Sequence, residues 1–153
     1  MSPLDPSKPP DDQDIPAFPS YLRGVWTNNI IPAHVPCQFS MWQQGPVVGG
    51  INAGPEIVVS ATPNVPINVL SVVGRLKVPS TSGNVGVEVF VNGANMLGTT
   101  LIVPVNEKTS VSVVPTVAEL HDGDLLTMNC TQVGTGASGL SVHLLCSSRV
   151  TYP

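Results

Sequence analysis

The feature that most constrains the fold is a strict alternation of valine with other residues over Asn84–Val91. Successive side chains point to opposite faces in a β-strand, so this pattern predicts a strand with one buried face. The strand runs directly into Asn92-Gly93, a pair favoured in type I′ hairpin turns because both central residues need a positive φ. We therefore expect Asn95–Val103 to be its antiparallel partner. The alternating residues are Val85, Val87, Val89 and Val91.

Short β-rich runs separated by turn signals fill the chain from Pro55 onward. A tight polar turn is expected at His121–Asp124 and a glycine-rich connector at Gly134–Gly139. Seven or eight antiparallel strands without a helix between them predict an all-β fold, a two-sheet β-sandwich of jelly-roll or immunoglobulin-like type. The other expected strands are Glu56–Thr62, Ile67–Val78, Ser110–Val114, Val117–Leu120, Leu125–Val133, Leu140–Cys146 and Arg149–Tyr152.

The same alternation assigns side chains to the core. One face of the long strand at 67–78 is expected to carry Leu70, Val72, Leu76 and Val78. Across the core, Leu126, Met128 and Cys130 are expected to face Val142, Leu144 and Cys146. The cysteines Cys37, Cys130 and Cys146 are odd in number and lack CxxC spacing, so we expect buried free thiols rather than a disulfide framework or a zinc site.

The first part of the chain follows a different pattern. Ten of the 16 prolines lie at positions 3, 6, 9, 10, 16, 19, 32, 36, 46 and 55. Proline removes backbone donors and biases the preceding residue toward extended conformations. The sequence therefore predicts an extended proline-rich N-terminal arm over residues 1–55, followed by the β-sandwich domain over residues 56–153.

Both tryptophans of the chain lie within the arm, in a stretch at 21–48 that is richer in large apolar residues than the first 20. An extended segment cannot bury large aromatic side chains by itself, so either its own domain or a neighbouring subunit must cover them. We expect a partner to do so, which makes Tyr21, Trp26, Phe39 and Trp42 the candidate partner-binding residues.

Charge excludes some classes of partner. Residues 1–14 contain four aspartates and one lysine, a balance of −3 within a net charge of −4 for the chain. The other arginines and lysines are scattered, so the electrostatic attraction that drives binding to nucleic acid or to an anionic membrane is missing. The acidic, proline-rich start is also unlike a secretory signal, so we expect synthesis in the cytoplasm or transport as part of a larger assembly.

No linear motif points to catalysis, and we expect a non-enzymatic protein without a metal or another cofactor. The three histidines, His34, His121 and His143, are far apart and none lies in a metal-binding or catalytic motif. His143 is expected on the outward face of its strand. Asp122 and Asp124 flank a glycine, but a calcium loop needs more oxygen ligands, so they are expected to form the turn.

Residues 84–146 contain NVGVEVFVNG, then NMLGTTLIVP, then ELHDGDLLTMNCTQVGTGASGLSVHLL. This series resembles the small β-sandwich domains of tailed-bacteriophage virion proteins, which include minor tail, fibre, baseplate and head-decoration proteins. The resemblance lies in the valine-alternating strand ending at Asn92-Gly93, the Gly123-Asp124 turn that opens a strand, and the Gln132-Val133-Gly134 step into a glycine-rich loop. The arm has no counterpart in it.

The resemblance implies a virion structural protein, assembled in the host cytoplasm, that catalyses no reaction. The first interpretation is a minor tail or baseplate-associated component that docks on other virion proteins by its N-terminal arm. A capsid decoration protein is the alternative. The resemblance also implies a homotrimer, and the apolar residues on both faces of 67–78 are consistent with self-association.

A carbohydrate-binding module used in host attachment, with a host-surface glycan as partner, is a competing interpretation. Sugars are commonly bound on exposed aromatic side chains of β-sandwiches. Residues 56–153 contain only Phe90 and Tyr152 as aromatics, which leaves little surface for stacking a sugar ring.

Overall fold

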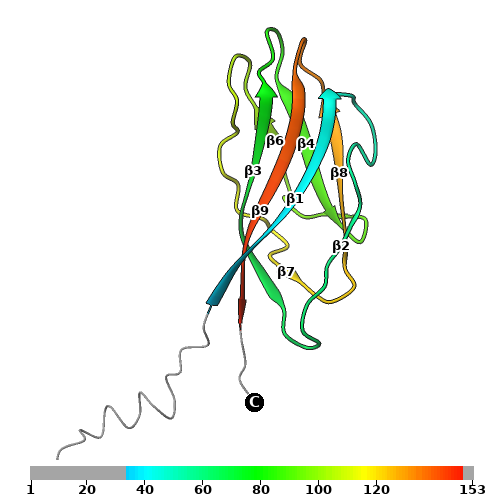
Figure 1. Ribbon diagram of the computed structural model, residues 1–153, viewed down its shortest axis with the longest axis vertical. Helices are drawn as coiled ribbons and strands as arrows, with labels where there is room; N and C mark the ends of the chain where they lie inside the picture. The colour runs from blue at the N-terminus through cyan, green and yellow to red at the C-terminus, as the bar shows by residue number, and fades with distance from the viewer. Residues whose placement is uncertain (1–33, 150–153) are drawn as a thin grey trace, which may run out of the picture. The chain divides into compact units, whose positions relative to one another are not determined.

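The computed structural model describes residues 34–149, and every regular element among them is a β-strand (Figure 1). Two antiparallel sheets pack on each other as a β-sandwich, as the sequence predicts at this level. The strands are β1 (His34–Pro46), β2 (Ile57–Val58), β3 (Ile67–Val78), β4 (Val85–Val91), β5 (Ala94–Asn95), β6 (Leu101–Val103), β7 (Glu119–Leu120), β8 (Leu125–Gln132) and β9 (Ser138–Arg149).

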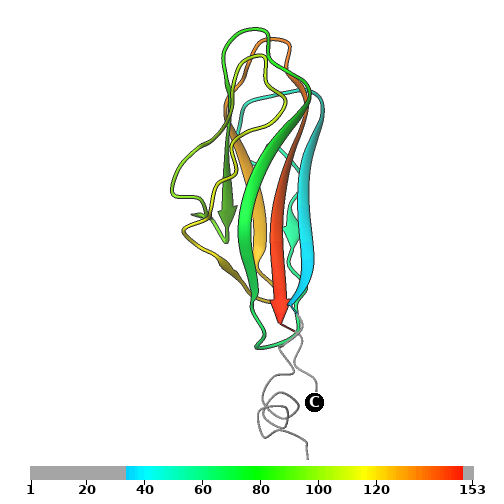
Figure 2. The ribbon, with the colours of Figure 1, turned by 90° about the vertical axis from the view of Figure 1, so that its left-hand side faces the viewer.

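The first sheet has the strand order β1-β9-β3-β7, and we call it sheet A. The second, sheet B, has the order β2-β8-β4-β5, with β6 also paired to β4. Figure 2 shows β1, β9 and β3 side by side in one layer, with β4 and β8 in the other. Apart from the run β4-β5-β6, each connection along the chain crosses from one sheet to the other. This explains why the strand order could not be inferred from hairpin signals.

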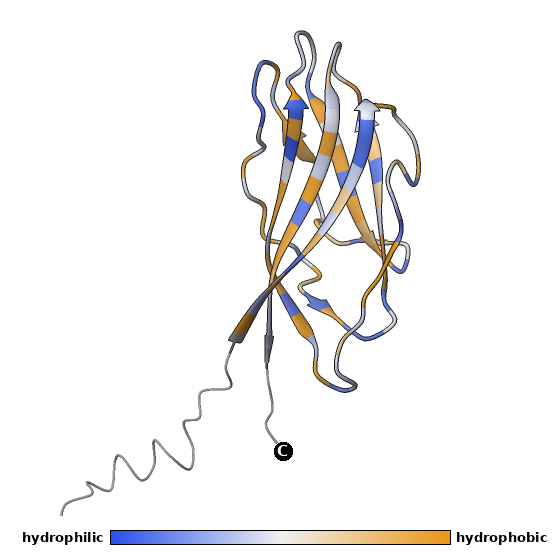
Figure 3. Ribbon diagram, in the orientation of Figure 1, coloured by the Kyte–Doolittle hydropathy of each residue, from blue (hydrophilic) through white to orange (hydrophobic). Residues whose placement is uncertain are grey.

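The core lies between the two sheets and is built from alternate residues of the long strands (Figure 3). The two inward-facing sets predicted on β8 and β9 are confirmed as buried. They are Leu126, Met128 and Cys130 from sheet B and Val142, Leu144 and Cys146 from sheet A. All three cysteines are free thiols, and Cys130 and Cys146 are buried.

The predicted hairpin after β4 is confirmed, since Asn92 has φ 49° and Gly93 has φ 83°. Its second strand is interrupted, however, so that Asn95–Val103 divides into β5 and β6. The side-chain oxygen of Asn95 accepts hydrogen bonds from the backbone N–H of Leu97 (2.9 Å) and of Gly98 (3.2 Å). A local turn of this kind competes with the sheet for backbone donors and breaks the strand.

The boundaries of β3 match the predicted strand, but its face assignment was wrong in part. A β-bulge lies between Val69 and Ser71, so that Val69 and Val72 both face the core. Leu70 is 51% exposed and Val78 is 45% exposed, although both were expected inside. An extra residue in one strand reverses the alternation beyond it. The bulge therefore explains why Val69 and Val72 share the inward face while Leu70 is outward. Val78 is in phase with Leu76, and it is exposed because it lies at the end of the strand.

Other predicted strands are shorter than expected. The strand at Glu56–Thr62 is reduced to β2. The segment 110–114 forms no regular strand, because it contacts β3 only through isolated bridges such as Val72 with Val113. Arg149 ends β9, and the rest of the expected final strand lies outside the described residues.

The start of the sandwich differs from the expected boundary at 55/56. The strand β1 pairs with β9 from His34 opposite Arg149 to Gln43 opposite Leu140, and Met41 is fully buried. Residues 34–46 are therefore part of sheet A. Because β1 is an edge strand, one side of it needs no backbone partner, which lets a sheet accept prolines there. The arm before His34 lies outside the described residues.

Two turns are tied together at the end of β4. The side-chain N–H of Asn92 donates to a carboxylate oxygen of Asp124 at 2.7 Å, and the backbone N–H of Leu125 donates to the Asn92 side-chain oxygen at 2.9 Å. The backbone N–H of His121 donates to the other Asp124 oxygen at 2.7 Å. This bond, more than any other contact, holds the pKa of Asp124 below its usual value.

We expect Asp124→Asn to lower the free energy of unfolding at pH 7 by about 1–3 kcal/mol, because hydrogen bonds to a charged acceptor are lost. A lowered folded-state pKa stabilises the fold fully above the unfolded pKa of about 4, and this contribution declines as pH falls below it. The variant should therefore lose less stability than the wild type between pH 5 and pH 2. Urea unfolding at several pH values measures this, with the exposed Glu119→Gln as control. Equal acid sensitivity in Asp124→Asn and wild type would contradict it.

Candidate functional site

The structure describes two of the four predicted partner-binding residues. Tyr21 and Trp26 lie outside the described residues. Phe39 and Trp42 both lie on β1 but face opposite ways, as residues an odd number apart in a strand must. Phe39 packs against the margin of the core, whereas Trp42 is 52% exposed on the outer face of sheet A. Trp42 is thus the member of this set that the structure shows to be accessible.

Strand register places three side chains in one row across the outer face of sheet A. Trp42 of β1 is directly opposite Ser141 of β9, and Ser141 is directly opposite Arg75 of β3. Neighbouring strands lie about 4.8 Å apart, so the Cα atoms of Trp42 and Arg75 are about 10 Å apart with the serine between them. We call these three residues the central row.

A hydrogen-bonded network of polar side chains lies beside the central row. The amide nitrogen of Gln38 lies 2.9 Å from Nδ1 of His143, and the hydroxyl of Ser40 lies 2.9 Å from the same atom. The other ring nitrogen, Nε2, lies 3.0 Å from the Ser141 hydroxyl. The four side chains come from β1 and β9, and the network fixes their rotamers on the sheet surface.

The partners of His143 also determine its protonation. An amide nitrogen can only donate, so Nδ1 is the acceptor and Nε2 carries the proton that Ser141 accepts. Partial burial, with the nearby Arg75 charge as a second cause, lowers the pKa of His143 below its usual value and keeps the ring neutral at pH 7. Ser141 therefore keeps its own hydroxyl proton for a further acceptor.

Two shallow hollows on the same face flank this network. One, of about 300 Å³, is lined by Gln38, Ser71, Val73, Arg75, Thr109, His143 and Leu145. The other, of about 390 Å³, is lined by Trp42, Gln43, Gln44, Gly45, Lys77, Gly139, Leu140 and Ser141. Each hollow contains one end of the central row together with polar side chains.

The charged side chains on the three strands around the central row are of one sign. Neither β1, β3 nor β9 contains an aspartate or a glutamate, whereas β3 carries Arg75 and Lys77. The acidic side chains among residues 34–149 lie elsewhere, and one of them, Glu119, is on β7 at the far edge of the same sheet, opposite Asn68. These acidic residues are Glu56, Glu88, Glu107, Glu119, Asp122 and Asp124. The part of the outer face that β1, β9 and β3 form is therefore cationic, although the net charge of the protein is −4.

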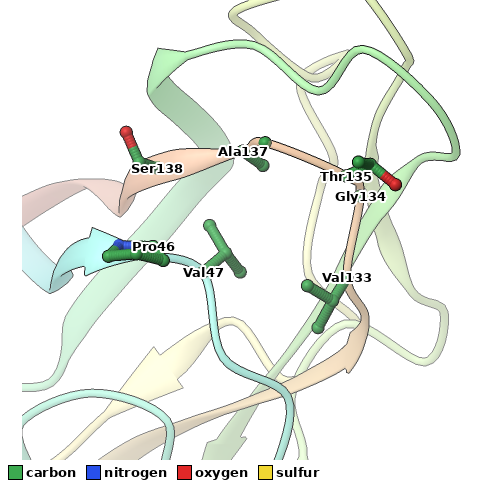
Figure 4. A pocket seen from close by; sticks show the side chains of 8 residues that line it. Pro46, Val47, Val133, Gly134, Thr135, Ala137 and Ser138 are labelled. Atoms are coloured by element: carbon green, nitrogen blue, oxygen red, sulfur yellow. The ribbon is translucent and has the colours of Figure 1, made fainter.

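A third hollow, of about 360 Å³, lies where β1 and β8 end (Figure 4). Val47 and Val133 point toward each other across it, while the hydroxyls of Thr135 and Ser138 point away. None of its lining residues is ionisable. This hollow offers neither a charged group nor a nucleophile with an adjacent base.

Within residues 34–149, no three His, Cys, Asp or Glu side chains gather as a metal site would require. The same part of the chain contains no helix suited to crossing a membrane. His143 lies on the outward face of its strand, as predicted. The sequence did not indicate the hydrogen-bond partners of His143, because Gln38 and Ser40 are more than 100 residues away along the chain.

No protein-family model matches this chain, and no curated protein matches it either.

Proposed function

We propose that this protein is a non-enzymatic structural component of a tailed-bacteriophage virion, a minor tail or baseplate-associated protein that docks on other virion proteins by its N-terminal arm. The observation that carries the proposal is the position of β1. The arm leads at His34 directly into the edge strand of sheet A, which pairs with β9 on one side.

The composition of this edge supports docking there. Between Pro36 and Pro46, residues 37–44 contain no charged side chain and no further proline. Exposed edge strands usually carry charges or prolines that prevent pairing with other chains. An uncharged edge suits the addition of a strand from a neighbouring protein, and aromatic residues that precede it in sequence can fill pockets on the same neighbour. We assign the tether to Tyr21 and Trp26, since Phe39 packs against the core and Trp42 belongs to the outer face of sheet A.

A capsid decoration protein would use the same tether, so the proposal covers both positions in the particle. Self-association as a trimer stays part of the proposal on the resemblance alone. Leu70 and Val73 of β3 both lie on the outer face of sheet A, and Leu70 is exposed and available to a second copy.

The proposal predicts that a chain beginning at His34 folds but fails to enter particles. Each aromatic anchor contributes about 2–4 kcal/mol at an interface, so losing two of them weakens binding by a factor of about 10³ or more. Particles are assembled with the full chain, with the chain 34–153, or with Tyr21→Ala and Trp26→Ala combined, and the incorporated protein is quantified by mass spectrometry.

Phe18→Ala is the matched control, because this aromatic residue of the arm lies before the anchor segment at 21–48. It should leave incorporation unchanged. Incorporation of the chain 34–153 at the level of the full chain would show that the arm is not the tether.

A further inference from the structure

We propose that the outer face of sheet A binds an oligosaccharide that contains an acidic sugar, with Trp42 as the stacking surface and Arg75 as the partner of the sugar carboxylate. This goes beyond the proposed function, because the face is formed by β1, β9 and β3 and does not require the arm. Sequence reasoning disfavoured sugar binding because residues 56–153 contain only two aromatics. That argument loses its basis, since β1 brings Trp42 into the sandwich.

Trp42 has the exposure that stacking requires. Its indole is 52% exposed although the residue lies in the middle of a regular strand. A large aromatic side chain left open on a polar face loses the free energy that its burial would supply, so an exposed one marks a contact surface. The apolar C–H face of a pyranose ring is flat and similar in size to the indole, and it would cover this surface.

The polar groups between Trp42 and the Arg75 hollow suit the hydroxyls of a sugar. Sugar hydroxyls both donate and accept, so they need neighbours of both kinds. Ser141 accepts from Nε2 of His143 and keeps a donor free, while the carbonyl oxygen of the Gln38 side chain is an acceptor. Because His143 already holds these side chains in place, binding of a ligand would cost them little conformational entropy.

Charge selects an acidic sugar over a neutral one. Arg75 stands at one end of the central row, and Lys77 lines the hollow that contains Trp42. A guanidinium binds a carboxylate through two parallel hydrogen bonds. No acidic side chain occurs on β1, β3 or β9 to pair with either cation. A carboxylate about 10 Å from the stacked ring, carried by a neighbouring sugar unit, matches the length of the central row.

A protein partner fits this face less well. Its outward side chains include few apolar ones near the central row, chiefly Val73 and Leu145, and these are separated by serine, glutamine and histidine. The buried centre of a stable protein interface is richer in apolar and aromatic residues than this. A mostly polar face with one aromatic and two cations is typical of a small polar ligand.

The test measures binding of defined oligosaccharides to the full chain by isothermal titration calorimetry. Tetragalacturonate and 3′-sialyllactose supply the carboxylate from a uronic acid and from a sialic acid, and maltotetraose is the neutral probe. We expect one acidic probe to bind more tightly than maltotetraose. Trp42→Ala should weaken that binding roughly 10-fold to 100-fold, whereas Trp42→Phe should retain most of it, since a ring still stacks.

Arg75→Gln should remove the preference for the acidic probe while leaving the thermal unfolding midpoint close to wild type. Phe18→Ala, a change to an aromatic residue outside both the tether and the central row, is the control and should bind like the wild type. Absence of binding by both acidic probes would overturn the proposal, as would equal affinity in Trp42→Ala and wild type. A loss of oligomerisation or of particle incorporation in Trp42→Ala, without a change in sugar binding, would instead identify the face as a protein interface.

Discussion

A chain that begins at Glu56 is expected to remain unfolded, whereas a chain that begins at His34 folds. The longer chain contains β1 and the segment after it, and the shorter chain lacks both. β1 pairs with β9 over most of its length, and Met41 and Val47 are buried in the core. Without them, one side of β9 loses its backbone partners and the core is opened along an edge.

The free energy of folding lost with β1 exceeds the total stability of a typical domain. Removing a single buried Met or Leu side chain costs about 2–5 kcal/mol. Domains of this size are stable by only about 5–15 kcal/mol. Loss of several core contacts together with a full row of sheet hydrogen bonds should therefore abolish cooperative folding.

Circular dichroism and thermal unfolding of the chains 34–153 and 56–153 measure this directly. Met41→Ala in the chain 34–153 serves as an intermediate case and should lower the free energy of unfolding by about 2–5 kcal/mol. A cooperative thermal transition in the chain 56–153 would contradict the placement of β1 in the core.

The second large effect concerns the thiol of Cys146. Burial raises the pKa of this thiol to about 12, with a smaller contribution from Cys37 directly opposite on β1. Only the thiolate is nucleophilic, so at pH 8 alkylation of Cys146 should be slower than that of an exposed cysteine by a factor on the order of 10³. Its full burial slows the reaction further.

Iodoacetamide labelling at pH 8, followed residue by residue with mass spectrometry, measures this rate in the native chain and in urea. Cys146 should become reactive only when the protein unfolds, whereas the partly exposed Cys37 should react earlier. Labelling of Cys146 in the native chain at the rate of a short cysteine peptide would show that β1 does not cover it.

Local sequence patterns predicted those parts of the fold that depend on neighbouring residues. The alternation in β4 and the Asn92-Gly93 turn both hold, because side-chain alternation and positive φ are properties of a few consecutive residues. The boundaries of β3 were predicted for the same reason. Its bulge at Leu70 was not, because a bulge depends on the partner strand β9.

The largest difference between the predicted and the observed fold is β1, which was predicted as part of the arm because of its prolines. Pro36 and Pro46 argue against a strand inside a sheet, and they are compatible both with an edge strand and with an extended arm outside the sheet. The partner of β1 is β9, about 100 residues later, and such a pairing leaves no local pattern.

The candidate site was predictable only in part for the same reason. Sequence reasoning singled out Trp42 and placed His143 on an outward face. It could not bring Trp42, Ser141 and Arg75 into one row, because that row is set by two separate strand registers. The cationic character of the surface that β1, β9 and β3 form likewise becomes visible only when these three strands are placed side by side.

The most direct test of the central claim is a three-dimensional reconstruction of the intact particle, combined with protein identification by mass spectrometry. We predict that the sandwich of residues 34–149 is found on a tail, baseplate or capsid surface, with Tyr21 and Trp26 seated in a neighbouring virion protein. Purified particles that lack this chain, or a sandwich held only through contacts of residues 34–149 with nothing bound to the arm, would contradict it.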